Sequence, residues 1–148
     1  MRSKLVADNA GERTYVLVLD PGEEAFRAIG KFAGEQFLSG ASLTALGAFL
    51  QATVGWFDPA AKAYRKIPVT EQCEVLSALG DIALDDKGKP SLHMHVVLGF
   101  SDGSTRGGHL LEGLVRPTLE VTLTEAPVRL RRKQRPELGL ALIDLAAG

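Results

Sequence analysis

The sequence predicts an α+β protein, with one main helix and a largely antiparallel sheet of six to eight strands. Short runs of alternating apolar and polar residues recur along the chain, and turn-forming sequences separate them. One segment near the start instead repeats its apolar residues at three- and four-residue steps, the period of a helix. An order in which many strands follow a single helix is typical of α+β folds rather than of alternating βαβ units.

Composition indicates a single globular domain that spans residues 1–148. Of the 148 residues, 45% are hydrophobic and 24% charged, and the net charge of −1 provides no general attraction to nucleic acid. No apolar run approaches the roughly 20 residues of a membrane-spanning helix. The first residues lack the apolar centre of a signal peptide, and the single cysteine, Cys73, is expected in the core. We therefore expect a cytoplasmic protein.

The first elements follow from their periodicity. Residues 13–19 alternate as a strand, and Asp20-Pro21-Gly22 forms a turn after it. Residues 23–38 suit an amphipathic helix, because two glutamates at its start complement the helix dipole and Gly40 follows its end. The small apolar residues from 41 to 54 predict one or two further strands.

The next elements are predicted to form hairpins. Residues 47–57 and 63–69 flank a short Asp-Pro turn, and residues 71–84 read as a bent strand or a strand pair. The most apolar run, 92–100, follows. Alternation then predicts strands at 119–124 and 128–131, and the apolar segment 138–146 is either a helix or an added strand.

All three histidines lie in or just after the run 92–100. Side chains alternate along a strand, so His93 and His95 point to the same face. Two imidazoles at this spacing can bind one metal ion, and His109 arrives after the turn at Asp102-Gly103. Three imidazoles leave one position of a tetrahedral zinc ion open, as in reactive zinc sites. The alternative is that these are partly buried strand residues that hydrogen-bond to their neighbours.

The strand register decides whether His109 can join the other two. A two-residue loop at Asp102-Gly103 would place His109 opposite Val96, on the wrong face. A bulge at Gly107-Gly108, or a loop of another length, would bring it to the correct face. The metal hypothesis therefore requires one of these two departures from the simplest hairpin.

Several motifs together resemble the PPC domain (plants and prokaryotes conserved). The most specific is Gly107-Gly108-His109-Leu110, which follows His93-x-His95 and Asp102-Gly103 at matching spacing. The likeness spans roughly residues 10–131 and leaves 132–148 as a C-terminal extension. Its other parts are Arg13, Gly22-Glu23-Glu24, Gly47-Ala48, Glu74-Val75-Leu76-Ser77 with Gly80, Val115, and Thr118-x-Glu120-Val121.

This resemblance implies a compact domain built on an antiparallel sheet, and a homotrimer. In plant members an AT-hook segment precedes the domain and binds DNA, while the domain itself serves assembly and partner contact. Stand-alone prokaryotic members are called DNA-binding largely through that association. This chain contains no Arg-Gly-Arg-Pro hook, and its nearest piece is Gln134-Arg135-Pro136.

Two functional hypotheses follow. The first is a trimer with a three-histidine site for zinc or a similar divalent metal, used in hydrolysis or in binding a small molecule. Glu112 and Glu74 are candidates either for general bases or for carboxylates that hydrogen-bond to the metal ligands. The second is a DNA-binding or transcription-associated assembly module. Its DNA contacts would be weak and would come from the basic segment made of Arg129, Arg131, Arg132, Lys133 and Arg135.

Overall fold

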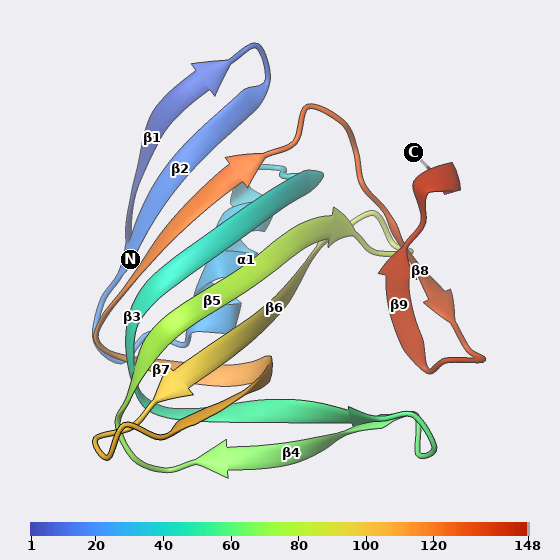
Figure 1. The fold of residues 1–148 in the computed structure, drawn as a ribbon. Helices are drawn as coiled ribbons and strands as arrows, with labels where there is room; N and C mark the ends of the chain where they lie inside the picture. The colour runs from blue at the N-terminus through green and yellow to red at the C-terminus, as the bar shows by residue number, and fades with distance from the viewer. Residues whose placement is uncertain (148) are drawn as a thin grey trace.

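The computed structural model describes residues 1–147. Its main sheet has seven strands, and Figure 1 shows a two-stranded hairpin that stands apart from them. The sheet strands are β1 (Arg2–Asn9), β2 (Glu12–Leu19), β3 (Gly40–Asp58), β4 (Ala63–Val69), β5 (Cys73–Leu84), β6 (Pro90–Gly99) and β7 (Thr105–Glu125). The remaining elements are the helix α1 (Ala25–Glu35), the hairpin strands β8 (Arg132–Arg135) and β9 (Leu140–Ile143), and a short 3₁₀ turn, η1 (Leu145–Ala147).

The strands of the main sheet pair in the order β1-β2-β7-β6-β5-β3-β4, and every pairing is antiparallel. β7 also pairs with β3 along most of its length. Strands β3, β5, β6 and β7 therefore form a closed ring, whereas β1–β2 and β4 extend from it. Because β3 and β7 are long and contain register shifts, they can bend enough to close this ring.

The hydrophobic core lies between the helix and one face of the sheet (Figure 1). Helix α1 contributes Ile29 and Phe32, which are buried against strand residues such as Leu17 and Leu123. The Tyr15 ring meets the Phe32 ring edge-on, with their centres 5.2 Å apart. Apolar positions of β5 and β6 that point to this face, including Met94, are also buried.

The predicted fold class is confirmed, and the elements agree closely with those expected from periodicity. The expected first strand is β2, the expected helix is α1, and the hairpin with the Asp-Pro turn is β3–β4. Some strands are longer and more continuous in the structure than the sequence predicted. Residues 40–58 form one strand, as do residues 105–125, because bulges let a strand bend without ending.

Two predictions about the ends of the chain need correction. β1 is an additional edge strand that was not predicted. Most of its residues are exposed, so its sequence does not show the alternation of apolar and polar residues that marks a half-buried strand. Residues 128–131 do not form the predicted strand; β8 begins at Arg132, where the chain turns to pair with β9. The C-terminal apolar segment supplies β9, which was one of the two alternatives. Cys73 is buried, as expected.

No helix among the described residues is long and apolar enough to cross a membrane.

Candidate metal centre

The structure brings the three histidines together on the sheet face opposite the helix. His93 and His95 lie on β6, and His109 lies on β7 directly opposite His95. One nitrogen atom from each ring can be chosen so that all three atoms lie within 4.8 Å of one another. The ring centres of His93 and His109 are 5.0 Å apart, and those of His95 and His109 are 5.4 Å apart.

Loop length, rather than a bulge, produces this register. β6 and β7 pair without a register shift from Gly99–Thr105 to His95–His109. The connection contains a three-residue loop, because the Phe100 N–H donates to the Ser104 carbonyl oxygen at 3.0 Å. The two-residue loop considered from sequence would have displaced the register by one residue and turned His109 away.

The glycine pair before His109 has a different role from the predicted bulge. A Cβ atom on Gly107 would lie 2.7 Å from the Val96 carbonyl oxygen, and one on Gly108 would lie 2.7 Å from the Gly55 carbonyl oxygen. Here β7 passes between β6 and β3 at very short range. The glycines therefore permit a close approach of three strands immediately beside the histidines.

His109 holds a polar atom that the fold does not satisfy. Its Nδ1 is buried and has no hydrogen-bond partner among the described residues. The Tyr64 ring stacks on the His109 imidazole, with ring centres 4.6 Å apart and planes tilted by 24°. Buried polar atoms are normally paired, so an orphaned ring nitrogen within a group of three imidazoles fits a site for a bound ligand.

Asp81 and Arg132 support the histidine cluster from one side. Asp81 lies opposite His93 on β5, and its Oδ2 is 3.3 Å from His93 Nδ1. The other carboxylate oxygen accepts a hydrogen bond from the buried Arg132, whose Nη1 also donates to the Ser91 carbonyl oxygen at 2.8 Å. This places a carboxylate behind His93, an arrangement that orients metal-binding imidazoles in other proteins.

The local environment favours the neutral imidazole at His95 and at His109. Burial is the main cause that lowers the pKa of His109 to about 4, and the neighbouring His93, His95 and Arg132 contribute to the same shift. Burial, together with His93, also lowers the pKa of His95. Burial alone would raise the pKa of Asp81, but the His93 hydrogen bond and the Arg132 charge outweigh it and hold that pKa below its usual range. Neutral imidazole is the form that binds metals.

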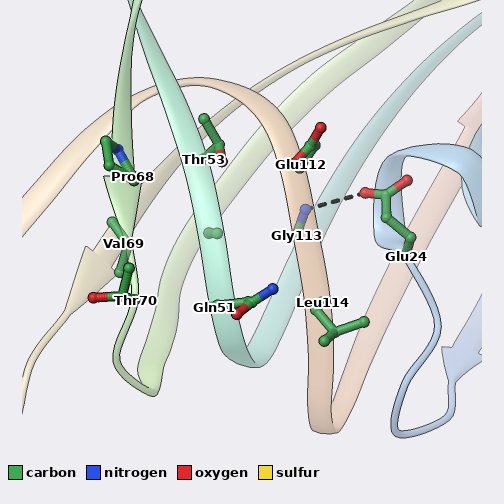
Figure 2. Close-up of a pocket in the computed structure, with 10 residues that line it drawn as sticks. Glu24, Gln51, Thr53, Pro68, Val69, Thr70, Glu112, Gly113 and Leu114 are labelled. Atoms are coloured by element: carbon green, nitrogen blue, oxygen red, sulfur yellow. Dashed lines mark hydrogen bonds between the residues drawn. The ribbon is translucent and has the colours of Figure 1, made fainter.

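The two glutamates proposed as general bases lie away from the histidines. Glu112 lines a separate cavity of about 280 Å³ with Gln51, Thr53 and Glu24, as Figure 2 shows. Glu74 is exposed on β5, seven residues from Asp81, which is roughly 23 Å at about 3.3 Å per residue. The carboxylate that does reach the cluster is Asp81, which the sequence interpretation did not select.

A signal for Asp81 was present in the sequence. Asp85 and Lys89 close a short turn, in which the Asp85 N–H donates to the Lys89 carbonyl oxygen at 2.8 Å. Counting outward from that turn pairs Leu84 with Pro90 and Asp81 with His93. An acidic residue opposite a histidine on the same face was therefore derivable once the turn was placed.

The basic segment does not form one continuous surface. Arg132 is buried beside Asp81, so it points into the protein rather than toward a phosphate backbone. Arg135 lies 3.8 Å from Asp144, which partly neutralises it. Lys133 is exposed, and Arg129 and Arg131 line a shallow cavity with Phe37. At most four of the five predicted basic side chains are therefore available to contact DNA phosphates.

Comparison with known proteins now identifies the family. A profile of the Plants and Prokaryotes Conserved (PCC) domain matches residues 7–127, which is most of the chain and includes all three histidines. The chain belongs to the PCC domain family. The hairpin β8–β9 lies beyond the end of this match.

Solved structures of similar proteins share the PCC fold. A plant- and prokaryote-conserved (PPC) protein from Pyrococcus horikoshii is 32% identical, with a TM-score of 0.84 over 93% of this chain and 97% of its own. A metal-containing protein from Archaeoglobus fulgidus is 30% identical, with a TM-score of 0.82 over 97% and 98% of the two chains. A candidate DNA-binding protein from Bacteroides thetaiotaomicron is 27% identical, with a TM-score of 0.87 over 95% and 96%.

A curated relative is much longer than this PCC chain. The bifunctional protein GlmU from Synechococcus sp. (strain JA-3-3Ab) is 31% identical over 135 residues, which are 90% of this chain. The chain spans about a fifth of the length of that relative, with 20% covered.

Proposed function

We propose that this PCC protein is a homotrimer that binds one divalent transition metal, zinc or a similar ion, per chain through His93, His95 and His109. The observation that carries the proposal is the set of three imidazole nitrogens within 4.8 Å of one another. The orphaned Nδ1 of His109 and the metal-containing relative from Archaeoglobus fulgidus also support it.

The donor set fits a transition metal better than calcium or magnesium. Imidazole nitrogen suits zinc, copper, iron and nickel, whereas calcium and magnesium prefer oxygen. In a tetrahedral zinc site three imidazoles leave one coordination position for a small ligand. A metal bound there would act as a Lewis acid toward that ligand. The protein's own contribution is to hold the His95 and His109 imidazoles neutral and, through Asp81, to orient the His93 ring.

Metal analysis of protein purified without a histidine tag tests this proposal. We expect about one equivalent of a single transition metal per chain, measured by plasma mass spectrometry after dialysis against metal-free buffer. His109→Ala should reduce that content to near zero, whereas Asp86→Asn, an exposed control in the β5–β6 turn, should retain it. Wild-type protein that takes up no metal on reconstitution with Zn²⁺, Co²⁺ or Ni²⁺ would refute the proposal.

An exposed apolar patch next to the histidines supports the trimer. Leu79 and Val97 are 60% and 43% exposed, and Leu79 lies directly opposite His95 on the neighbouring strand. Leu76, 52% exposed, extends the patch along β5. Large apolar side chains gathered on one sheet face commonly mark an interface. Light scattering at micromolar concentration should give three times the chain mass, and Leu79→Arg should yield monomer.

The second candidate function is a DNA-associated assembly module. The observation in its favour is the candidate DNA-binding relative from Bacteroides thetaiotaomicron. We expect only weak, sequence-independent binding through Arg129, Arg131, Lys133 and Arg135, because affinity of this type comes from phosphate neutralisation. A salt-titrated binding assay tests it: nanomolar, sequence-dependent binding at physiological salt would show that DNA is a specific partner.

A further inference from the structure

A cavity of about 460 Å³ lies between the histidine cluster and the hairpin β8–β9. His93, His109 and Tyr64 line one side, while Arg132 and β9 line another. The geometry points to a binding site for a small monocarboxylate with an apolar tail. This inference rests on the proposed function, because it places the carboxylate between the metal site and Arg132. The volume is within the usual range of roughly 300–1,000 Å³ for small-molecule sites.

Arg132 provides a fixed donor for a carboxylate. Its side chain is 7% exposed, and bonds to Asp81 and the Ser91 carbonyl oxygen hold the guanidinium in place. A guanidinium carries five N–H donors, and these two bonds occupy two of them. Since Arg132 lines the cavity, its remaining donors can form charge-assisted hydrogen bonds with a carboxylate.

The charges around the cavity favour an anion. Arg132 and Asp81 are the charged side chains that line it, and they neutralise each other. A divalent ion at the histidines would therefore leave an uncompensated positive charge beside a partly buried space. An anionic ligand balances that charge, and a neutral ligand does not.

The other wall favours an apolar tail. Leu140, Leu142 and Ile143 of β9 line the cavity, and Leu142 and Ile143 are each 41% exposed. A hydrocarbon chain lying against these side chains would remove apolar surface from water. A carboxylate also costs less than phosphate to place beside the Asp81 carboxylate in a partly buried space, because it carries one negative charge and phosphate carries nearly two.

The wall itself is held over the cavity from both ends. A hydrogen bond from the Leu84 N–H to the Leu130 carbonyl oxygen, 2.8 Å long, fixes the chain just before β8. At its tip, the Lys62 Nζ donates to the Pro136 carbonyl oxygen at 3.4 Å. Gly139 packs so closely on Lys62 that an added Cβ would lie 2.6 Å from the Lys62 Cβ. These contacts hold the hairpin in place as one wall of the cavity.

Isothermal titration calorimetry with hexanoate on the metal-loaded protein tests the inference. Metal content is measured on the same samples, so loss of metal is distinguished from loss of ligand binding. We expect saturable binding of one hexanoate per chain, at least about tenfold weaker binding of hexan-1-ol and of acetate, and weaker binding of hexyl phosphate. Tighter binding of hexyl phosphate would overturn the carboxylate assignment.

Two neighbouring basic residues provide a matched pair of variants. Arg132→Met and Lys133→Met remove the same charge from adjacent positions of β8, but Lys133 is exposed and does not line the cavity. We expect Arg132→Met to weaken hexanoate binding about tenfold or more and Lys133→Met to leave it unchanged. Equal effects of the two substitutions would mean that the anion senses only general charge, which overturns the inference.

Filling the cavity provides a test that does not disturb the Arg132–Asp81 pair. Ala141 lines the cavity from β9, and Ala141→Trp should block hexanoate while leaving one metal per chain. Full metal content with no hexanoate binding in the wild-type protein would refute the binding site and leave the metal proposal intact. Absence of metal would refute both.

Discussion

Two of the cavities on this molecule, the one in Figure 2 and the one beside the histidines, differ in whether the fold already uses their polar side chains. In the cavity of Figure 2, the Glu24 carboxylate caps α1 by accepting from the backbone N–H groups of Phe26 and Arg27, at 3.1 and 2.8 Å, and also accepts from Gly113 at 3.0 Å. In the histidine cavity, Nδ1 of His109 has no partner among the described residues. Groups that the fold leaves unpaired, rather than cavity shape, therefore distinguish the functional candidate from the structural one.

The comparison predicts that substitutions in the two cavities have opposite consequences. The largest expected effect is on metal affinity in His109→Ala. Loss of an outer hydrogen-bond partner typically weakens metal binding about 10–100-fold, so loss of a direct ligand should weaken it by more than about 100-fold. Competition with a chromophoric chelator measures this. Unchanged Zn²⁺ affinity would remove His109 from the site.

Asp81→Asn should produce the next largest effect, about a 10–100-fold loss of metal affinity. The amide cannot hold the His93 ring as a carboxylate does, although it has nearly the same shape. Asp86→Asn, in the exposed turn that joins β5 to β6, is the matched control and should bind metal normally. If both variants behave like the wild type, the Asp81–His93 contact has no part in metal binding.

Glu24→Ala should lower the free energy of unfolding by about 1–2 kcal/mol, because it removes an N-cap acceptor and leaves the Gly113 N–H unpaired. Metal content should stay at one per chain. Urea denaturation measures the first quantity and plasma mass spectrometry the second. Glu24→Gln, which keeps an acceptor oxygen, should lose less stability. Loss of metal in Glu24→Ala would show that the two cavities are not independent.

The last expected effect is the pH dependence of stability in chelator-treated protein. His109 has a folded-state pKa of about 4, well below its ordinary value of 6.5, so the unfolded chain takes up the proton first. Its contribution to stability is present above about pH 6.5 and is lost as the pH falls toward 4. The urea midpoint should fall over this range, and it should fall less in His109→Gln. Parallel pH profiles for the two proteins would contradict this.

Much of this site could be predicted from sequence, because alternation in a strand is a local property. It placed His93 and His95 on one face and identified a turn before His109. The position of His109 depended on whether the loop had two or three residues, and the Gly107-Gly108 pair suggested a bulge that the structure does not contain. Bulges and loop lengths are set by packing between strands, which a single sequence does not show.

The partners from other strands were harder to predict. Asp81 could be found by counting from the Asp85–Lys89 turn, but nothing local identified Arg132 as buried. It was grouped with surface cations because four of its neighbours in the sequence are also basic. The fold instead turns the chain at β8 and directs this one guanidinium inward, toward Asp81. Long-range pairing of charges decided its role.

The triple pairing of β7 has a consequence for how quickly parts of the molecule can open. β7 hydrogen-bonds to β2, β3 and β6, so its central amides cannot exchange with solvent unless the ring of strands separates. The hairpin β8–β9 pairs only within itself, and its side-chain bonds to the ring come from one residue, Arg132, which contacts Asp81 and the Ser91 carbonyl oxygen. Hydrogen exchange should therefore be slow around His109 and fast in residues 132–143. The hairpin would open and close many times during one opening of the ring, and a molecule could enter or leave the cavity while all three histidines stay in place.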